Sequence, residues 1–239
     1  MRHIGTPKVR DAESYFQALT GKRALEIGGP SDFFCHDGAL PVYPILASVD
    51  NCLFSCETMW TGKIDGRFYY DAQRREGIQF VCEVTALEPI GDASYDCVLA
   101  SHCLEHTANP LKALQEFRRI LKPGGLLLAI LPNMDDTFDW RRPLTPLSHM
   151  QEDYAKDTSE DDLSHLSEIL SLHDMRKDTF PGTIEEFRER CRQNHKFRIM
   201  HHHTFNPSSA GAFLESGGFR ILRTETVKPY NITILAQLD

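Results

Sequence analysis

The sequence predicts an α/β fold with a Rossmann-like, seven-stranded, doubly wound sheet that carries an antiparallel edge strand. Short, continuously apolar runs alternate with helical patterns up to residue 133, as is typical of parallel strands covered on both faces. A polar stretch then interrupts the alternation, and we interpret it as a helical insertion after the fifth strand. Two late apolar runs are separated by only three residues, so they must form an antiparallel hairpin, because parallel strands need a long crossover.

The composition limits the class of protein. A length of 239 residues fits one domain spanning residues 1–239. The formal net charge of −8 would repel phosphate backbones, so we expect no nucleic-acid partner. The chain has no run of about 18 apolar residues that would predict a membrane span, and residues 1–6 lack the apolar core of a signal peptide. With an odd count of seven cysteines, these features predict a cytoplasmic protein with reduced thiols.

The first four strands follow from short apolar runs that end at turn-forming or polar residues. Residues 23–27 form the first strand, and Gly28 and Gly29 end it. We expect a helix before it, at residues 11–19, and further strands at 46–50, 79–84 and 95–100.

The clearest helix lies between the fourth and fifth strands. Residues 110–121 carry an apolar stripe at helical spacing, Asn109 is the expected N-cap, and Pro110 suits the first helical position. A Pro-Gly-Gly segment at 123–125 ends the helix, and residues 126–131 form the fifth strand. Strand, helix and strand in this order predict a right-handed βαβ unit.

Residues 134–206 differ in character from the rest of the chain. They are polar and charged, have no strand-like run, and hold seven of the eleven histidines. We expect a helical, histidine-rich lid within the single domain. The sheet pattern then resumes with a helix at 207–216 and strands at 219–227 and 231–237.

Four short motifs follow one another along the predicted sheet. They read LEIGGP at 25–30, SYDCV at 94–98, HCLEH at 102–106 and LKPGG at 121–125. With these motifs the chain resembles the class I S-adenosylmethionine (SAM)-dependent methyltransferases, specifically the type 11 group, over residues 23–133 and 207–238. The resemblance does not extend over the insertion. It implies SAM as the cofactor and a small-molecule methyl acceptor as the partner, and it leaves the oligomeric state open.

Ligands of a doubly wound sheet bind beyond the carboxyl ends of its strands, where the strand order reverses. Gly28 and Gly29 lie there and permit a tight turn close to a ligand, while Pro30 stands where the family usually has a third glycine. Asp50, at the expected end of the second strand, would accept hydrogen bonds from both ribose hydroxyls, although an ordinary turn aspartate is the alternative.

The remaining cofactor contacts are expected at neighbouring strand ends. Glu26 would anchor the methionine ammonium through bound water. The family commonly has an aspartate where this chain has Glu83, and the resemblance implies a contact with the adenine amino group there. Val84 and Ser101 complete the set of expected contacts.

His102, Glu105 and His106 follow the fourth strand with the spacing i, i+3 and i+4. If they open a helix, they share one face and converge on a divalent cation. The motif is similar to the E-x-x-E-H with which small-RNA 2'-O-methyltransferases and ubiquinone-pathway O-methyltransferases bind a metal, with His102 in place of the first glutamate. That replacement favours borderline ions such as Zn²⁺ or Fe²⁺ over Mg²⁺. His203, from the histidine run 201–203, is the expected fourth ligand.

The same histidines are candidates for roles without a metal. His106 would act as a general base on the acceptor, with His102 and His203 as the other candidate catalytic residues. Packing and helix capping by the segment 104–106 is a further alternative. The H-x-x-E-H spacing also occurs in inverzincin proteases, but here it lies between a parallel strand and Pro110, which leaves no room for their long helix.

The insertion opens with Trp140, Arg141 and Arg142, close to where this fold often contacts the acceptor. The arginines would pair with a carboxylate or phosphate of the acceptor, or with the acidic run 160–162. We expect methyl transfer to an oxygen or nitrogen atom of a small polar metabolite. The alternatives are a catalytically silent SAM-fold binding or scaffold protein and a nucleotide-dependent oxidoreductase, which the incomplete G-x-G-x-x-G motif disfavours.

Overall fold

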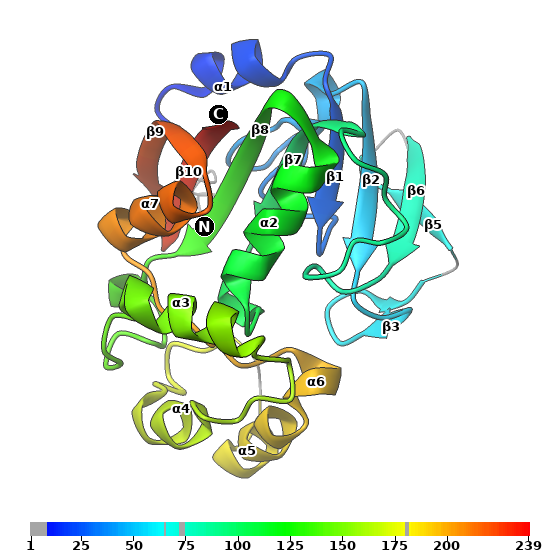
Figure 1. Ribbon diagram of the computed structural model, residues 1–239. Helices are drawn as coiled ribbons and strands as arrows, with labels where there is room; N and C mark the ends of the chain where they lie inside the picture. Colours follow the sequence, from blue (N-terminus) through cyan, green and yellow to red (C-terminus); the bar gives the residue numbers. More distant parts are fainter. Residues whose placement is uncertain (1–8, 65, 72–74, 180–181) are drawn as a thin grey trace, which may run out of the picture.

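The computed structural model describes residues 9–64, 66–71, 75–179 and 182–239. A central sheet carries helices on both faces, and a separate group of helices lies beyond one end of its strands (Figure 1). The expected α/β class is therefore confirmed. The start of the chain, at residues 1–6, where we expected no signal peptide, lies outside the described residues.

Five parallel strands form the middle of the sheet. They are β1 (Arg23–Ile27), β2 (Ser48–Leu53), β6 (Glu76–Val81), β7 (Tyr95–Ser101) and β8 (Leu121–Pro132). The central strand, β1, pairs with β2 on one side and with β7 on the other. The strand order therefore reverses at β1, which makes the carboxyl ends of β1 and β7 the expected place for a ligand.

The two edges of the sheet are antiparallel. On one side β10 (Asn231–Leu238) pairs with β8, and β9 (Phe219–Val227) pairs with β10. On the other side the short β5 (Arg67–Tyr69) pairs with β6, which gives the order β5-β6-β2-β1-β7-β8-β10-β9. The sheet thus has one strand more than the seven expected. A three-residue strand such as β5 has too few residues for an apolar pattern to reveal it.

Two strands have limits that differ from the sequence expectation, and the limits of β2 decide which of its residues reach the site. The strand β2 begins at Ser48, after a 3₁₀ turn at Tyr43–Ile45, and ends at Leu53 rather than at Asp50. The strand β6 begins at Glu76, three residues before the expected start at residue 79. Asp50 pairs with Leu25 in the middle of the sheet.

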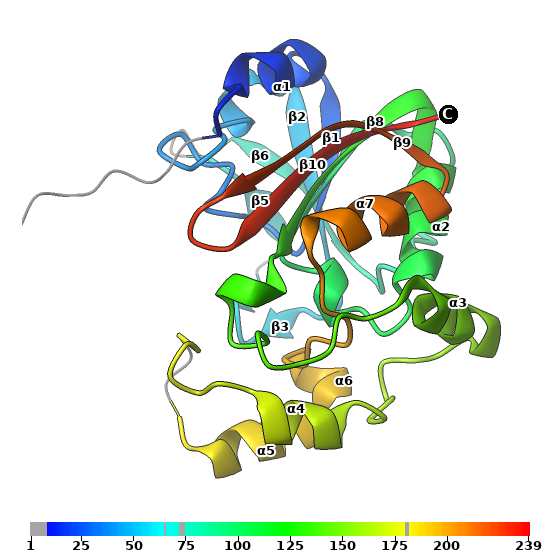
Figure 2. The same ribbon diagram turned by 90° about the vertical axis from the view of Figure 1, so that its left-hand side faces the viewer.

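Helices cover the two faces and bury two apolar cores. On one face, α2 (Pro110–Ile120) and α7 (Pro207–Ser216) pack their apolar side chains, such as Phe117 and Phe213, against the sheet. On the other face, α1 (Ala12–Leu19) packs Tyr15 together with the loop that precedes β2. Figure 2 shows α1 on one side of the sheet and α2 and α7 on the other. Asn109 is the predicted N-cap of α2, since it accepts a hydrogen bond from Lys112 N, and Asn206 caps α7 in the same way by accepting one from Ser209 N.

The insertion is helical, as expected. It contains α3 (Leu147–Lys156), α4 (Leu166–Leu172), α5 (Ile184–Arg192) and the single turn α6 (Asn194–Phe197). Its composition suggested few apolar contacts, but the described part buries a small core of its own, including Ile169, Phe187 and Met200. The histidine run 201–203 is also buried rather than solvated. Whether the insertion moves as a lid stays a prediction.

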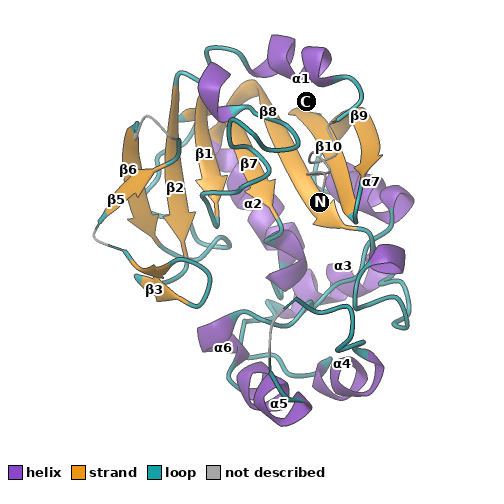
Figure 3. Ribbon diagram, turned by 180° about the vertical axis from the view of Figure 1, so that it is seen from behind, coloured by secondary structure: helices purple, strands orange, loops and turns teal. Residues whose placement is uncertain are grey.

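The carboxyl ends of the parallel strands point toward the insertion. In Figure 3 the arrowheads of β1, β2 and β7 all face the helices α4, α5 and α6. Because ligands of this fold bind beyond the carboxyl ends of the strands, a site is expected on the side of the sheet that faces the insertion.

Within the described ranges, no helix is both long enough and apolar enough to span a membrane.

Candidate active site

A cavity of about 470 Å³ lies beyond the carboxyl ends of β1, β2, β6 and β7. This volume is within the usual range for small-molecule sites, about 300–1,000 Å³. The cavity is found where the strand order reverses about β1, as the fold predicts. The expected cofactor contacts that line it are Gly28, Pro30, Glu83, Val84 and Ser101.

The glycine loop after β1 needs glycine at both positions, for different reasons. Gly28 has a φ of +79°, a conformation that side chains with a Cβ rarely adopt, and its backbone lines the cavity. Gly29 lies against the buried side of the loop, where an added Cβ would be 2.2 Å from Glu26 Oε2. The first glycine lets the backbone approach a ligand, and the second lets the loop close over Glu26.

Glu26 supports this loop from beneath and is fully buried. Its carboxyl group accepts hydrogen bonds from the Tyr43 hydroxyl at 2.7 Å and from the Ser31 backbone N–H at 3.1 Å. Burial raises the pKa of Glu26 to about 8, although these two hydrogen bonds act to lower it. The structure therefore places Glu26 below the loop rather than in the cavity where we expected it to meet the methionine ammonium.

Asp50 lies away from the cavity, which corrects the expected ribose contact. Its Oδ1 accepts a hydrogen bond from the Ile78 N–H at 2.8 Å. Its Oδ2 accepts from the Arg23 guanidinium at 2.9 Å and from the Tyr95 hydroxyl at 2.7 Å. The carboxylate is thus taken up by protein donors in the middle of the sheet. Asp50 does not reach the cavity because β2 continues past it and ends at Leu53.

Residues that sequence analysis missed form much of the cavity wall. Leu53 and Phe54 line it at the true end of β2, and Trp60 reaches it from the turn between β3 (Glu57–Thr58) and β4 (Gly62–Lys63). Arg198 reaches it from the insertion. The spacing of apolar residues does not predict these positions, because Phe54, Trp60 and Arg198 lie in turns or in an irregular segment.

Arg198 joins the insertion to the strand end after β6. Its Nη2 lies 2.5 Å from Glu83 Oε1, and its Nη1 lies 2.7 Å from Glu160 Oε2. Arg198 itself is buried and stacks its guanidinium over the Phe54 ring. Burial raises the pKa of Glu160, and the nearby Arg198 charge opposes that rise. The Arg198 guanidinium therefore forms ion pairs with both Glu83 of the cavity wall and Glu160 of the insertion.

A second cavity of about 420 Å³ adjoins the first and lies beneath the insertion. The two cavities share three lining residues, Trp60, His102 and His106. The rest of the second cavity is lined by aromatic side chains and by charged or polar ones, among them Phe138, Phe187, Tyr230, Lys177 and His173. The arrangement provides two adjacent ligand sites that meet at two imidazoles.

His102 does not share a helix face with Glu105 and His106, in contrast to the sequence expectation. His102 has a φ of 50°, and only a short 3₁₀ helix follows it, at Leu104–His106. Its Nδ1 lies 3.3 Å from Glu105 Oε1, and its Nε2 lies 2.7 Å from Asn231 Oδ1. Burial alone would lower the pKa of His102, but the contact with Glu105 raises it. Burial alone would raise the pKa of Glu105, but His102 lowers it.

Glu105, His106 and His201 come together instead, each offering a ligand atom within 4.8 Å of the others. His106 Nδ1 lies 3.1 Å from Met200 O, so this nitrogen carries the proton and Nε2 keeps its lone pair. His201 Nδ1 lies 2.5 Å from Asp139 Oδ2. The His106 ring borders both cavities but is otherwise enclosed, and burial, followed by the nearby His201, lowers its pKa to about 4. His106 is therefore neutral at neutral pH.

His203 lies in a different group from the one expected. It is fully buried and joins His149 and Asp153, whose ligand atoms lie within 4.8 Å of one another and of His203. Strict alternation in an extended segment would put His201 and His203 on one side. The chain instead bends at residues 202–203, which turns His203 away from His201, while the His202 ring contacts Asn194. The structure thus puts His201, and not His203, beside Glu105 and His106.

The aromatic and basic residues at the start of the insertion have structural partners. Arg142 is buried and pairs with Asp139 at 3.1 Å and with Glu168 at 2.7 Å. Arg141 lies 3.3 Å from Asp174, and the Trp140 indole N–H donates to the same carboxylate. The arginines therefore bind acidic residues of the insertion, although not the run 160–162 that we considered.

The chain is similar to several known methyltransferases. Residues 64–129 match the family described as "Methyltransferase domain". A ubiquinone/menaquinone biosynthesis C-methyltransferase of Vibrio cholerae is 26% identical over 188 residues, which is 71% of this chain and 64% of the relative. A SAM-dependent methyltransferase from Aquifex aeolicus superposes with a TM-score of 0.49 at 15% identity, covering 96% of this chain and 90% of that one. A 1,6-didemethyltoxoflavin-N1-methyltransferase from Burkholderia thailandensis, solved with S-adenosylhomocysteine, has a TM-score of 0.49 at 13% identity, with coverages of 96% and 78%.

Proposed function

We propose that this chain, which has the fold and the domain of the class I SAM-dependent methyltransferases, methylates an oxygen or nitrogen atom of a small polar metabolite. The observation that carries this proposal is the pair of cavities that meet at Trp60, His102 and His106. A methyl donor and an acceptor must lie side by side for a direct displacement, and adjoining sites provide that geometry.

The first cavity suits SAM. Its size, the positive φ of Gly28 and the neighbouring strand ends all fit a nucleoside-bearing ligand that needs close approach of the backbone. Gly28, Pro30, Glu83 and Ser101 are the residues that would hold it. When bound, SAM supplies an activated methyl group.

The second cavity suits a compact acceptor with a ring and polar substituents. Phe138, Phe187 and Tyr230 offer aromatic surface, while Lys177 and His173 offer charge and hydrogen bonds. A neutral His106 directs its Nε2 lone pair away from Met200, and it would accept a hydrogen bond from an acceptor O–H or N–H at the junction. This role orients the acceptor and receives the proton that methyl transfer displaces.

A second observation favours an alternative role for His106, in which Glu105, His106 and His201 hold a divalent cation and the Nε2 lone pair binds that cation instead of taking the acceptor proton. Glu105 is fully buried; its Oε1 has the 3.3 Å contact with His102 Nδ1, and its Oε2 has no hydrogen-bond partner among the residues that the structure describes. A buried carboxylate without such partners is costly, and a cation between these three side chains would compensate it. The expected set of His102, Glu105, His106 and His203 is replaced by the three that the fold brings together. Such a cation would polarise an acceptor oxygen.

The test is a binding and turnover assay on the full chain. Calorimetry with SAM and with NAD(P) separates a methyltransferase from an oxidoreductase, and methyl transfer from labelled SAM separates an enzyme from a silent scaffold. Labelled SAM is supplied with panels of hydroxylated and aminated aromatic compounds. NMR of the product then distinguishes O- or N-methylation from the C-methylation named for the Vibrio cholerae relative. SAM binding without turnover on a whole-cell metabolite extract would contradict the proposal.

The role of the cation is tested by chelation. If a cation at Glu105 acts on the acceptor, exhaustive chelation abolishes turnover while SAM affinity is unchanged, and Glu105→Gln has the same effect. Full turnover after chelation would leave His106 acting without a metal.

A further inference from the structure

The insertion contains a second group of metal-ligating side chains, which we call the insertion cluster. It consists of His149, Asp153, His165 and His203. None of the four is among the described residues that line the two cavities. The insertion cluster therefore has no part in the proposed methyl transfer, and its chemistry needs a separate explanation.

Three separate stretches of the chain supply the insertion cluster. His149 and Asp153 are four residues apart on α3, so they share one face of that helix. His165 directly precedes α4, and His203 lies on the buried segment that leads into α7. Local sequence spacing explains only the first pair, because the fold brings the other two side chains to it.

His149, Asp153 and His203 each offer a ligand atom within 4.8 Å of the others, and His165 adjoins this group through His149. His149 Nε2 lies 2.9 Å from His165 Nε2 and 3.4 Å from Asp153 Oδ2. His203 Nε2 lies 3.8 Å from the same Asp153 oxygen. Two ligand atoms that are each 2.0–2.2 Å from a tetrahedral ion are about 3.3–3.6 Å apart. The three measured distances lie around that value.

Hydrogen bonds within the protein satisfy these groups only in part: His149 Nε2 and His165 Nε2 lie 2.9 Å apart, and His203 Nε2 lies 3.4 Å from Ala108 O. Asp153 Oδ2 and His203 Nδ1 are buried atoms without a hydrogen-bond partner in the described part of the chain. Asp153 Oδ1 is satisfied by the Thr158 hydroxyl at 3.2 Å, so the unsatisfied oxygen is the one that faces the histidines. His203 is fully buried. A buried carboxylate oxygen that lacks a hydrogen bond and lies beside two imidazoles, with a third imidazole next to them, is the arrangement that a cation would complete.

We propose that His149, Asp153, His165 and His203 bind one divalent cation of the zinc class. Three imidazoles and one carboxylate match the nitrogen and oxygen ligands that Zn²⁺ accepts, and four protein ligands leave no open position for a substrate. The site is therefore structural. It would fix α3, the start of α4 and the segment before α7 to one another, and so hold these three parts of the insertion in place.

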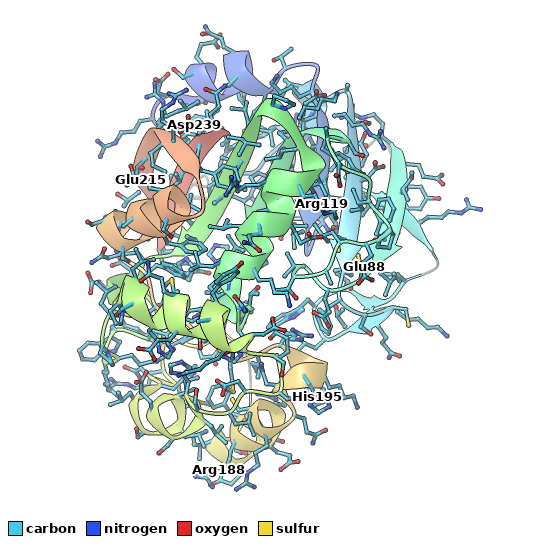
Figure 4. All side chains as sticks on the ribbon, viewed as in Figure 1. Glu88, Arg119, Arg188, His195, Glu215 and Asp239 are labelled. Atoms are coloured by element: carbon cyan, nitrogen blue, oxygen red, sulfur yellow. The ribbon has the colours of Figure 1, made fainter. Side chains whose placement is uncertain are left out.

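The test is the metal content and thermal stability of the full chain with Zn²⁺. His149→Ala and His165→Ala each remove one ligand at a partly exposed position, where a change of side chain disturbs packing least. His195→Ala is the matched control, because His195 is an exposed histidine on α6, at the outer surface of the insertion (Figure 4). Zinc per chain is measured by mass spectrometry after equilibration with Zn²⁺ and removal of the excess by dialysis.

We expect the wild-type chain and His195→Ala to hold one zinc ion more per chain than His149→Ala and His165→Ala. All four chains keep Glu105, so an ion bound there adds equally to each zinc content and does not change the difference between them. Zn²⁺ at about 100 times its dissociation constant should raise the melting temperature of the wild-type chain by about 5 °C or more, and it should not raise that of the two variants.

Equal zinc content in the wild-type chain and in both variants would overturn the proposal, and so would a wild-type chain that takes up no zinc. Should an alanine variant fail to fold, Asp153→Asn replaces the charge by an amide of the same shape. That variant should bind Zn²⁺ at least tenfold more weakly, and unchanged zinc affinity in a folded Asp153→Asn would likewise overturn the proposal.

Discussion

Replacing Arg198 by methionine should destabilise the protein strongly, because Arg198 is the shared partner of two acids. The Glu160 side chain is 13% exposed and lies 2.7 Å from Arg198 Nη1. Removing one partner of a buried ion pair costs about 3–5 kcal/mol, since the other charge stays buried and uncompensated. Glu83 is 41% exposed, so solvent screens its pair and limits that contribution to about 1 kcal/mol or less. We expect Arg198→Met to lower the free energy of unfolding by about 3–5 kcal/mol.

Urea denaturation followed by circular dichroism measures this loss. Arg192→Met is the matched control, because the Arg192–Glu189 pair is 3.8 Å apart and both side chains are more than half exposed. The control should change the free energy of unfolding by less than about 0.5 kcal/mol. Adding Glu160→Gln to Arg198→Met should recover much of the loss, because the buried charge is then gone. A loss in Arg198→Met no larger than in the control would refute the reasoning.

The remaining predictions concern the glycine loop and the junction of the cavities. Gly29→Ala should lower the free energy of unfolding by about 1–3 kcal/mol, because the added Cβ would lie 2.2 Å from Glu26 Oε2. Gly211→Ala, on α7, has open space around the added Cβ and should raise the free energy of unfolding by about 0.5–1 kcal/mol. Urea denaturation measures both changes. The pKa of Glu26 is raised to about 8 by burial, so its contribution to stability is complete below its ordinary pKa and is lost as the pH rises to about 8. The unfolding free energy of the wild-type chain should therefore fall more between pH 5 and pH 8 than that of Glu26→Gln, and equal falls would contradict the buried-acid assignment. Trp60→Ala should weaken SAM binding about 2- to 12-fold in calorimetry, through loss of an aromatic wall, and unchanged affinity would place SAM elsewhere.

Sequence patterns predicted the elements whose signals are local. The buried strands β1 and β7 contain short apolar segments next to turn-forming residues, and α2 and α7 carry their own caps at Asn109 and Asn206, so neighbouring residues define these elements. The strand ends of β2 and β6 depend on pairing between residues about 28 positions apart, as with Asn51 and Gln79. No local pattern encodes that register.

The same distinction applies to the site. Gly28 and Ser101 could be predicted as cavity residues because they follow strands with clear apolar runs. Asp50 was misplaced because its partners Arg23, Ile78 and Tyr95 are distant in sequence and take up its carboxylate. His201 was passed over for the same reason, since only the packing of the insertion shows which histidine of a run faces Glu105.

The segment that carries Arg198 and His201 borders both cavities at once. Arg198 lies on the wall of the first cavity, and His201, three residues later, lies on the wall of the second. If a ligand in one cavity orders this segment and that order favours binding in the other cavity, thermodynamic linkage makes the two effects on affinity equal. Donor and acceptor should therefore bind cooperatively, with a coupling that is transmitted through three residues of backbone.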